Sequence, residues 1–293
     1  MADTTDATLN LARRAWTLFE PIHAIVYFVP EASEHYTAAG LRGGWMGYFA
    51  SRAGAMGAVP ASVVAAVFHN FQPAMVARAI PDAWHYSSPE LALAARIAVA
   101  DSALRRLWGA EVESVEVAAA ARSALAVARG LRGDGRRLFA ANAALETPVL
   151  PHLQLWHACM LLREHRFDGH VAALTVHGLD GLESLVTAIA AGSGNDATTM
   201  RRFRGWTEAE WEQGVDGLRS RGILDAAGAL TDRGQGLRTA VEETTDRLAG
   251  EVWEAMDDAS RELLFARLRP LAGLLESSDG IRYPNPIGVP RPA

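Results

Sequence analysis

Lysine is absent from this sequence. All 28 basic residues among its 293 positions are arginines. This absence excludes several reaction classes, because a P-loop needs a lysine on the nucleotide phosphates, a protein kinase needs its strand lysine, and a pyridoxal-phosphate enzyme needs a lysine amine. The chemistry of this chain must therefore proceed without a side-chain primary amine.

Cysteine is almost as scarce. Cys159 stands alone, so the chain can form no intrachain disulfide and no cysteine-based zinc cluster. We therefore expect a reducing compartment and a cytoplasmic location. The N-terminal sequence MADTTDATLNLARRAW contains no apolar stretch of the length of a signal peptide or a membrane span, and we expect no membrane partner.

An excess of positive charge is also lacking. The 34 acidic residues outnumber the arginines, which gives a net charge of −6 and an isoelectric point of about 5.9. The chain as a whole therefore has no field that would attract nucleic-acid phosphates or an anionic membrane surface.

Apolar residues recur at spacings of three and four along most of the chain, which predicts a mainly α fold. We expect a first helix over about residues 7–19, ended or kinked by Pro21. The composition changes at Leu145–Pro151. We therefore divide the chain into an N-terminal helical domain (1–148), a junction helix with a second domain (149–278), and a proline-rich tail (279–293). The junction helix, 153–165, is apolar around most of its circumference and should be buried.

Residues 205–250 show the order of elements of a winged helix. Thr207 and Glu210 have capping-box spacing at the start of a helix over 207–221, followed by Leu218-Arg-Ser-Arg-Gly222-Ile-Leu224 and Leu230-Thr231-Asp-Arg-Gly234. This segment resembles the MarR-like winged-helix domain. The resemblance implies a helix-turn-helix and a short β-hairpin wing around residues 226–228.

The whole chain resembles an uncharacterised actinobacterial family of helical proteins with that C-terminal domain. The matching segments are EPIHAIVYFVPE (20–31), GGWMGYFASRAGAMGAVP (43–60), FHNFQPAMVARAIPDAW (68–84), LREHRFDGHVAAL (162–174) and NPIGVP (285–290). The resemblance implies an architecture and no particular reaction.

The helix expected to read DNA is acidic. It contains Glu208, Glu210, Glu212 and Asp216 against Arg219 and Arg221. Phosphate neutralisation supplies most of the affinity for DNA, so we expect this winged helix not to bind DNA. A MarR-like ligand-responsive transcription regulator is the alternative. Its support is Arg201, Arg202 and Arg204, which could contact phosphates or pair with the acids.

Two polar segments interrupt the apolar helices, EPIH and REHRFDGH. They supply the candidate catalytic residues Glu20, His23, Glu164, His165 and His170, which we expect to converge on one cleft because buried polar groups need partners. The second alternative is a metal-dependent enzyme with His23, His165 and His170 as ligands, helped by Glu20. A divalent metal suits these residues better than a haem. In the plainer interpretation, Asp168 is the N-cap of a new helix at His170, and Arg163, Glu164 and Arg166 form an ordinary salt-bridged helix end at the domain junction.

Aromatic residues and glycines crowd into the first eighty positions, which indicates a cavity or a tightly filled core. Our candidate ligand-binding residues are Tyr27, Trp45, Tyr48, His69, Asn70, Trp156 and His157. The leading hypothesis is an acidic winged-helix scaffold that binds a small apolar or aromatic molecule between two domains, with catalysis by the His/Glu set as an open question. The sequence also leaves a homodimer open.

Overall fold

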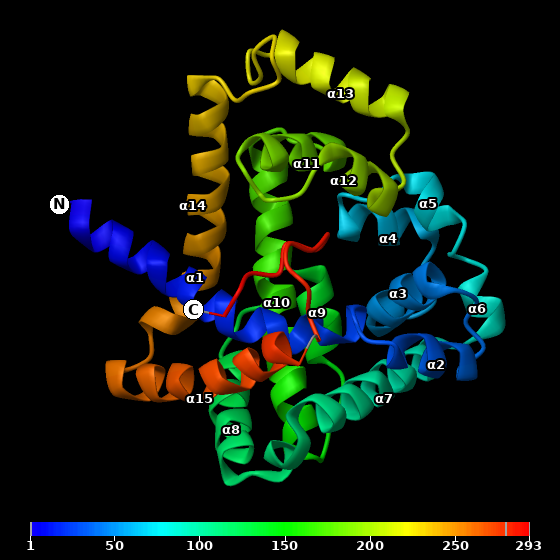
Figure 1. The fold of residues 1–293 in the computed structure, drawn as a ribbon, viewed down its shortest axis with the longest axis vertical. Helices are drawn as coiled ribbons and strands as arrows, with labels where there is room; N and C mark the ends of the chain where they lie inside the picture. Colours follow the sequence, from blue (N-terminus) through cyan, green and yellow to red (C-terminus); the bar gives the residue numbers. More distant parts are fainter. Residues whose placement is uncertain (1, 279, 293) are drawn as a thin grey trace.

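The prediction of a mainly helical fold is confirmed. A computed structural model describes residues 2–278 and 280–292, and those residues form helices α1–α15, three short 3₁₀ helices and no β-strand (Figure 1). The N-terminal half contains α1 (Ala2–Ala24), α2 (Glu31–Ala38), α3 (Gly44–Ala53), α4 (Ala61–Phe68), α5 (Pro73–Ala77), α6 (Ala83–Tyr86), α7 (Pro89–Trp108), α8 (Val115–Arg129) and α9 (Arg137–Ala143). The C-terminal half contains α10 (Pro151–Val176), α11 (Gly181–Ala190), α12 (Ala197–Arg204), α13 (Glu208–Ser220), α14 (Asp232–Glu254) and α15 (Asp258–Ser277). The 3₁₀ helices are η1 (Ile25–Tyr27), η2 (Gly54–Met56) and η3 (Gly109–Glu113).

The expected end of the first helix at Pro21 is wrong. Helix α1 runs on to Ala24 with Pro21 inside it. An interior proline removes one backbone hydrogen bond, but Phe19, Ile22 and the proline itself are buried. Packing of this end of α1 in the core outweighs the lost bond.

The expected break at Asp168-Gly169 is also wrong, because α10 continues through both residues to Val176. Asp168 caps a different helix: its carboxylate accepts the Phe139 N–H, 2.8 Å away, in the first turn of α9. A side chain at Gly169 would collide with the Arg136 guanidinium, which donates to the carbonyls of His165 and Leu248. This glycine therefore serves a close approach rather than a turn.

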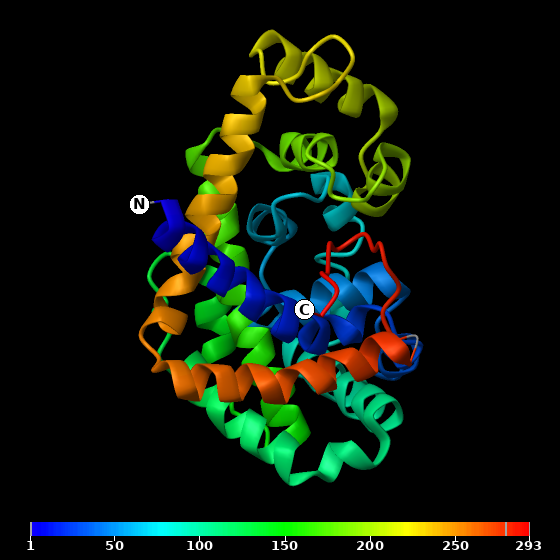
Figure 2. The same cartoon turned by 60° about the vertical axis from the view of Figure 1, so that its left-hand side comes forward.

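Helix α10 forms the axis of the molecule and packs against α1, α8, α9 and α14 (Figures 1 and 2). The prediction that its first part is buried is confirmed, since Trp156 and Leu155 are at most 2% exposed. One apolar cluster joins α1–α9 with the first part of α10, the end of α14 and α15, and a second joins the end of α10 with α11–α14. Because α10 and α14 contribute to both clusters, they connect the two parts of the core. The domain boundaries given above stay a prediction.

The expected β-hairpin wing is reduced to a single antiparallel bridge between Leu224 and Leu230. Asp225 closes the turn between them: its backbone N–H donates to the Ala229 carbonyl, and its carboxylate accepts the Ala229 N–H. The capping box at the start of α13 is confirmed: Thr207 accepts the Glu210 N–H, and Glu210 accepts the Thr207 N–H. Helices α12 and α13 are joined by residues 205–207, and α13 lies at one end of the molecule (Figure 1).

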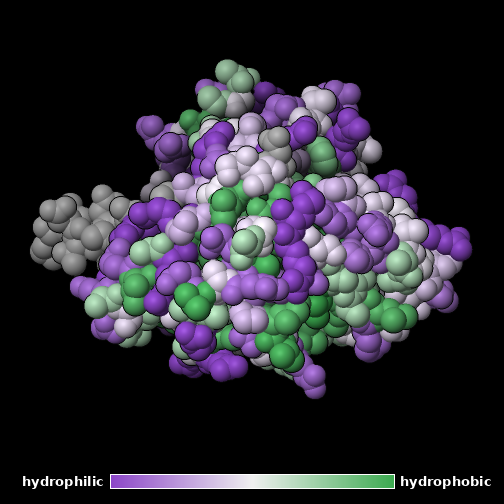
Figure 3. All heavy atoms as spheres, turned by 60° about the horizontal axis from the view of Figure 1, so that its bottom comes forward, coloured by the Kyte–Doolittle hydropathy of each residue, from purple (hydrophilic) through white to green (hydrophobic). Residues whose placement is uncertain are grey.

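Among the described residues, no single helix combines the length and the hydropathy needed to cross a membrane. The segments Gly44–Met56 and Ala61–Phe68 have the required length and hydropathy only when taken together, and the chain bends by 93° between them. On the face seen in Figure 3, apolar side chains form small patches between hydrophilic ones.

Candidate functional site

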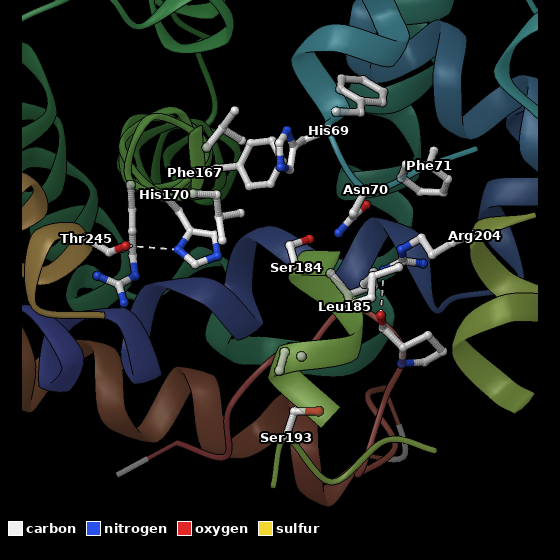
Figure 4. Close-up of a pocket in the computed structure, with 18 of the residues that line it drawn as sticks. His69, Asn70, Phe71, Phe167, His170, Ser184, Leu185, Ser193, Arg204 and Thr245 are labelled. Carbon is white, nitrogen blue, oxygen red and sulfur yellow. Dashed lines mark hydrogen bonds between the residues drawn. The ribbon is translucent and has the colours of Figure 1, made fainter. Parts of the chain in front are cut away.

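A cavity of about 280 Å³ lies between the two apolar clusters (Figure 4). Its wall is built from α1, α3, the loop after α4, α10, α11, α12, α14 and the C-terminal tail. Aromatic rings form its apolar part, namely Trp16, Tyr48, Phe68, Phe71 and Phe167. Its charged residues are Arg52, Arg163, Arg166, Arg204, Arg238, Glu20 and Glu242.

One side of the cavity rests on a buried ion-pair network. Glu164 on α10 is fully buried and accepts hydrogen bonds from Arg52 of α3 at 3.1 Å and from its neighbour Arg163 at 2.7 Å. Arg163 also reaches Glu20 of α1 at 3.4 Å. Three helices are thus joined through charged groups that are at least nine-tenths buried.

The pKa values in this network follow its charges. Burial by itself raises the pKa of Glu164, but the two arginines outweigh burial and hold that pKa well below its usual range. Burial also raises the pKa of Glu20, and Arg163 offsets only part of this rise. Glu164 is therefore a fixed anion, whereas Glu20 is the carboxyl closer to protonation.

The network continues into a second group of buried polar residues. Arg96 donates to the Tyr27 hydroxyl at 3.0 Å, and this hydroxyl lies 3.2 Å from His23 Nε2. An arginine can only donate, so the Tyr27 hydroxyl accepts from Arg96, while the tautomer of His23 sets the direction of the Tyr27–His23 hydrogen bond; Nδ1 of His23 has no hydrogen-bond partner. The Trp156 ring stacks on His23 with centroids 6.4 Å apart. Burial and the nearby Arg96 hold the pKa of His23 well below its usual value, so this ring is neutral.

The loop after α4 supplies the opposite wall. His69 has φ +58°, a conformation that side chains other than glycine rarely adopt, and its Nε2 is buried without a hydrogen-bond partner. Its carbonyl lies against the first residue of α11, where only Gly181 leaves enough room. Burial lowers the pKa of His69, so a neutral imidazole and the Asn70 side chain face the cavity (Figure 4).

His170 joins the cavity to α14. Its Nδ1 is 2.9 Å from the Thr245 hydroxyl, and burial, aided by Arg238 and Arg166, lowers its pKa to about 3. The adjacent cations have carboxylate partners: Arg166 pairs with buried Asp246 at 2.8 Å, and Arg238 with Glu242 at 2.6 Å.

The structure brings together some of the candidate residues and separates others. Glu20, Tyr48, His69, Asn70 and His170 line the cavity. Glu164, His23, Tyr27 and Trp156 belong to the network behind it. Trp45 packs on Tyr48 and Phe71 from outside and is 38% exposed.

His165 and His157 lie outside the cavity wall. The His165 ring stands edge-on to Phe139 with centroids 5.1 Å apart, and burial lowers its pKa to about 3. His157 lines a separate depression between α8, α9 and α10. No three His, Cys, Asp or Glu residues in the described part of the chain are grouped as metal ligands would be, and the trio His23, His165 and His170 is dispersed.

The sequence analysis did not place the cavity arginines or the acids on α14 in the candidate site, and it considered Arg204 only as a contact to phosphates or acids. A usable signal existed for Arg52, which occurs within an apolar run, where a charged residue implies a buried partner. The partners on α14 give no such signal, because Glu242 and Asp246 look like ordinary surface acids of a long helix.

These observations define a mainly helical protein in which an arginine-rich cavity adjoins a segment of two short helices joined by a turn. A model of a helix-turn-helix family matches residues 12–281, and the chain belongs to this family.

One curated relative was found. The chain is similar to a glycerol-3-phosphate dehydrogenase (NAD(P)+) of Deinococcus radiodurans, with 31% identity over 174 residues, or 58% of this chain and 50% of that protein. The chain thus spans about half the length of this relative. No solved structure matches the chain.

Proposed function

We propose that this protein binds a small molecule with an apolar or aromatic body in the cavity between its two apolar clusters. The observation that carries the proposal is the cavity itself, a hollow of about 280 Å³ whose wall combines aromatic rings with charged and polar side chains. Such a lining is typical of small-molecule sites. Catalysis by the Glu/His residues, and a metal among them, stay predictions.

Hydrogen bonds join the cavity wall to the helix-turn-helix segment. Gln72, two residues beyond Asn70, donates its backbone N–H to the Arg204 carbonyl at 2.8 Å and its side-chain amide to Glu210 at 3.0 Å. Trp206 donates to the Asn70 carbonyl at 3.0 Å. A ligand that displaces residues 69–71 would therefore also act on the start of α13.

The same contacts argue against DNA reading by α13. A recognition helix contacts bases mainly through its N-terminal residues, and here Glu210 in the first turn is engaged by Gln72. The side chains of Glu208 and Asp216 are more than 70% exposed, which leaves an acidic outer surface. We propose that α11–α14 form a MarR-like winged helix that serves as a scaffold in a family of the actinobacterial type.

Fluorescence titration with 1-aminoanthracene, a neutral aromatic dye, tests the cavity. We expect the dye to bind wild-type protein in a saturable manner. The Leu185→Trp variant fills the cavity from α11 and should weaken binding by at least about tenfold. Ala188→Leu, a smaller change on the same wall, should weaken it less.

The matched control is Leu263→Trp, because Leu263 is half exposed on α15 and lies outside the cavity wall. This variant should bind the dye as the wild type does, and circular dichroism should show that each variant is folded. Equal binding by the Leu185 and Leu263 variants would refute the proposed site.

A ligand-responsive transcription regulator is the second candidate, favoured by membership of the helix-turn-helix family. Arg202 and Arg233 are exposed and could contact phosphates. Selection of bound sequences from a genomic DNA library, with and without salt competition, distinguishes the two. Recovery of one short, salt-sensitive operator would establish the regulator, whereas we expect none.

A further inference from the structure

We propose that the ligand of the cavity carries a carboxylate and that Arg204 binds this group. The inference rests on the proposed small-molecule site and names the chemical class of its ligand. It comes from the one cavity arginine whose charge is not balanced by an acid.

The ion pairs of the cavity account for four of its five arginines. Arg52 and Arg163 share Glu164, and Arg163 also reaches Glu20. On the side of α14, Arg166 forms an ion pair with Asp246, and Arg238 forms one with Glu242. Among residues 11–278 and 280–292, whose side chains the structure describes, no carboxylate pairs with Arg204.

Arg204 is nevertheless buried, with 6% of its surface exposed. One of its nitrogens donates to the Pro286 carbonyl of the tail, and the guanidinium lies 4.7 Å from the centroid of the Phe71 ring. Its Nε has no hydrogen-bond partner. Burial lowers its pKa to about 10, so the group is still a cation at neutral pH. A buried cation without a counter-ion is costly, and an anionic ligand would remove that cost.

The neighbours of Arg204 suit a carboxylate on an aromatic body. Asn70 lies beside it, and His69 carries a second unpartnered buried nitrogen on the same wall (Figure 4). The planar guanidinium matches a planar carboxylate, and the Phe71 ring lies next to it, whereas Phe167 lies beside His69 across the cavity (Figure 4). A ligand there would place its charge on Arg204 and its ring near Phe71.

The test uses a pair of probes that differ in charge and little in shape, 4-fluorobenzoate and 4-fluorobenzamide, titrated by ¹⁹F NMR. We expect wild-type protein to bind the carboxylate at least about tenfold more tightly than the amide. In Arg204→Met, the preference should fall to within about twofold. Arg202→Met is the matched control, because Arg202 is exposed on the same helix, and it should keep the wild-type preference.

Arg204→Lys keeps the charge and loses the planar fork, and it should retain part of the preference. It replaces the methionine variant if that variant does not fold. Equal binding of the two probes by wild-type protein, no binding of either at millimolar concentration, or an unchanged preference in both Arg204 variants would overturn the inference. Continued binding of 1-aminoanthracene in those cases would leave the proposed site intact, whereas loss of dye binding would refute the site itself.

Discussion

Replacing Glu164 with Gln should be among the most destabilising conservative substitutions in this protein. The substitution preserves the shape of the side chain and removes the charge that Arg52 and Arg163 share. Both arginines are at least nine-tenths buried, so loss of the carboxylate leaves their charges poorly compensated. As an ionic partner Arg163 would keep Glu20 at the longer distance, whereas Arg52 would keep no carboxylate and would rely on the Tyr48 hydroxyl and nearby rings.

Removing one partner of a buried ion pair costs about 3–5 kcal/mol, and we expect a loss of that size at pH 7. Urea unfolding followed by circular dichroism measures it. The effect should depend on pH with a definite sign. The pKa of Glu164 is depressed in the fold, so its contribution is complete above its unfolded pKa of about 4.5 and disappears as the pH falls further. The difference between variant and wild type should therefore shrink in acid.

Glu262→Gln is the matched control. Glu262 pairs with Arg14 at 2.9 Å, but both side chains are at least 40% exposed, so the loss should be below about 1 kcal/mol. A second check is Arg52→Met combined with Glu164→Gln, which should be less destabilising than the sum of the single changes, because the two charges disappear together. A loss below about 1 kcal/mol for Glu164→Gln alone would refute the reasoning.

Three further outcomes are expected. Trp156→Ala should cost about 3–5 kcal/mol in urea unfolding, because the indole is buried and donates to the His23 carbonyl. The buried histidines should make the protein sensitive to acid. Since burial lowers the pKa of His157 to about 4, its contribution is complete above pH 6.5 and is lost toward pH 4, and His157→Gln should reduce the slope of stability against pH by about 1.4 kcal/mol per unit. Removing residues 284–293 should speed 1-aminoanthracene dissociation in stopped-flow measurements, since Pro286 and its neighbours close one side of the cavity.

The sequence by itself determined the helical class and several of its local features. Three- and four-residue periodicity, the capping box at Thr207 and the apolar circumference of 153–165 are short-range patterns. They predicted the helical class, the start of α13 and the burial of the first part of α10, although α10 runs on to Val176. The candidate site was predictable in part: the polar segments EPIH and REHRFDGH and the loop at His69 do contribute to the cavity and its network.

Tertiary structure decided the rest. Proline and glycine often end a helix, but tertiary packing can keep the helix intact across them. Burial keeps α1 helical through Pro21, and the close approach of Arg136 explains the glycine at 169 inside α10. Adjacent residues of α10 point in different directions, so Glu164 faces the network while His165 faces Phe139. Which arginine pairs with an acid depends on contacts between residues far apart in the sequence, such as Arg52 with Glu164 and Arg163 with Glu20. Arg204 lacks a carboxylate partner because the nearby acids contact other arginines in the folded chain, and no local sequence pattern could have revealed this.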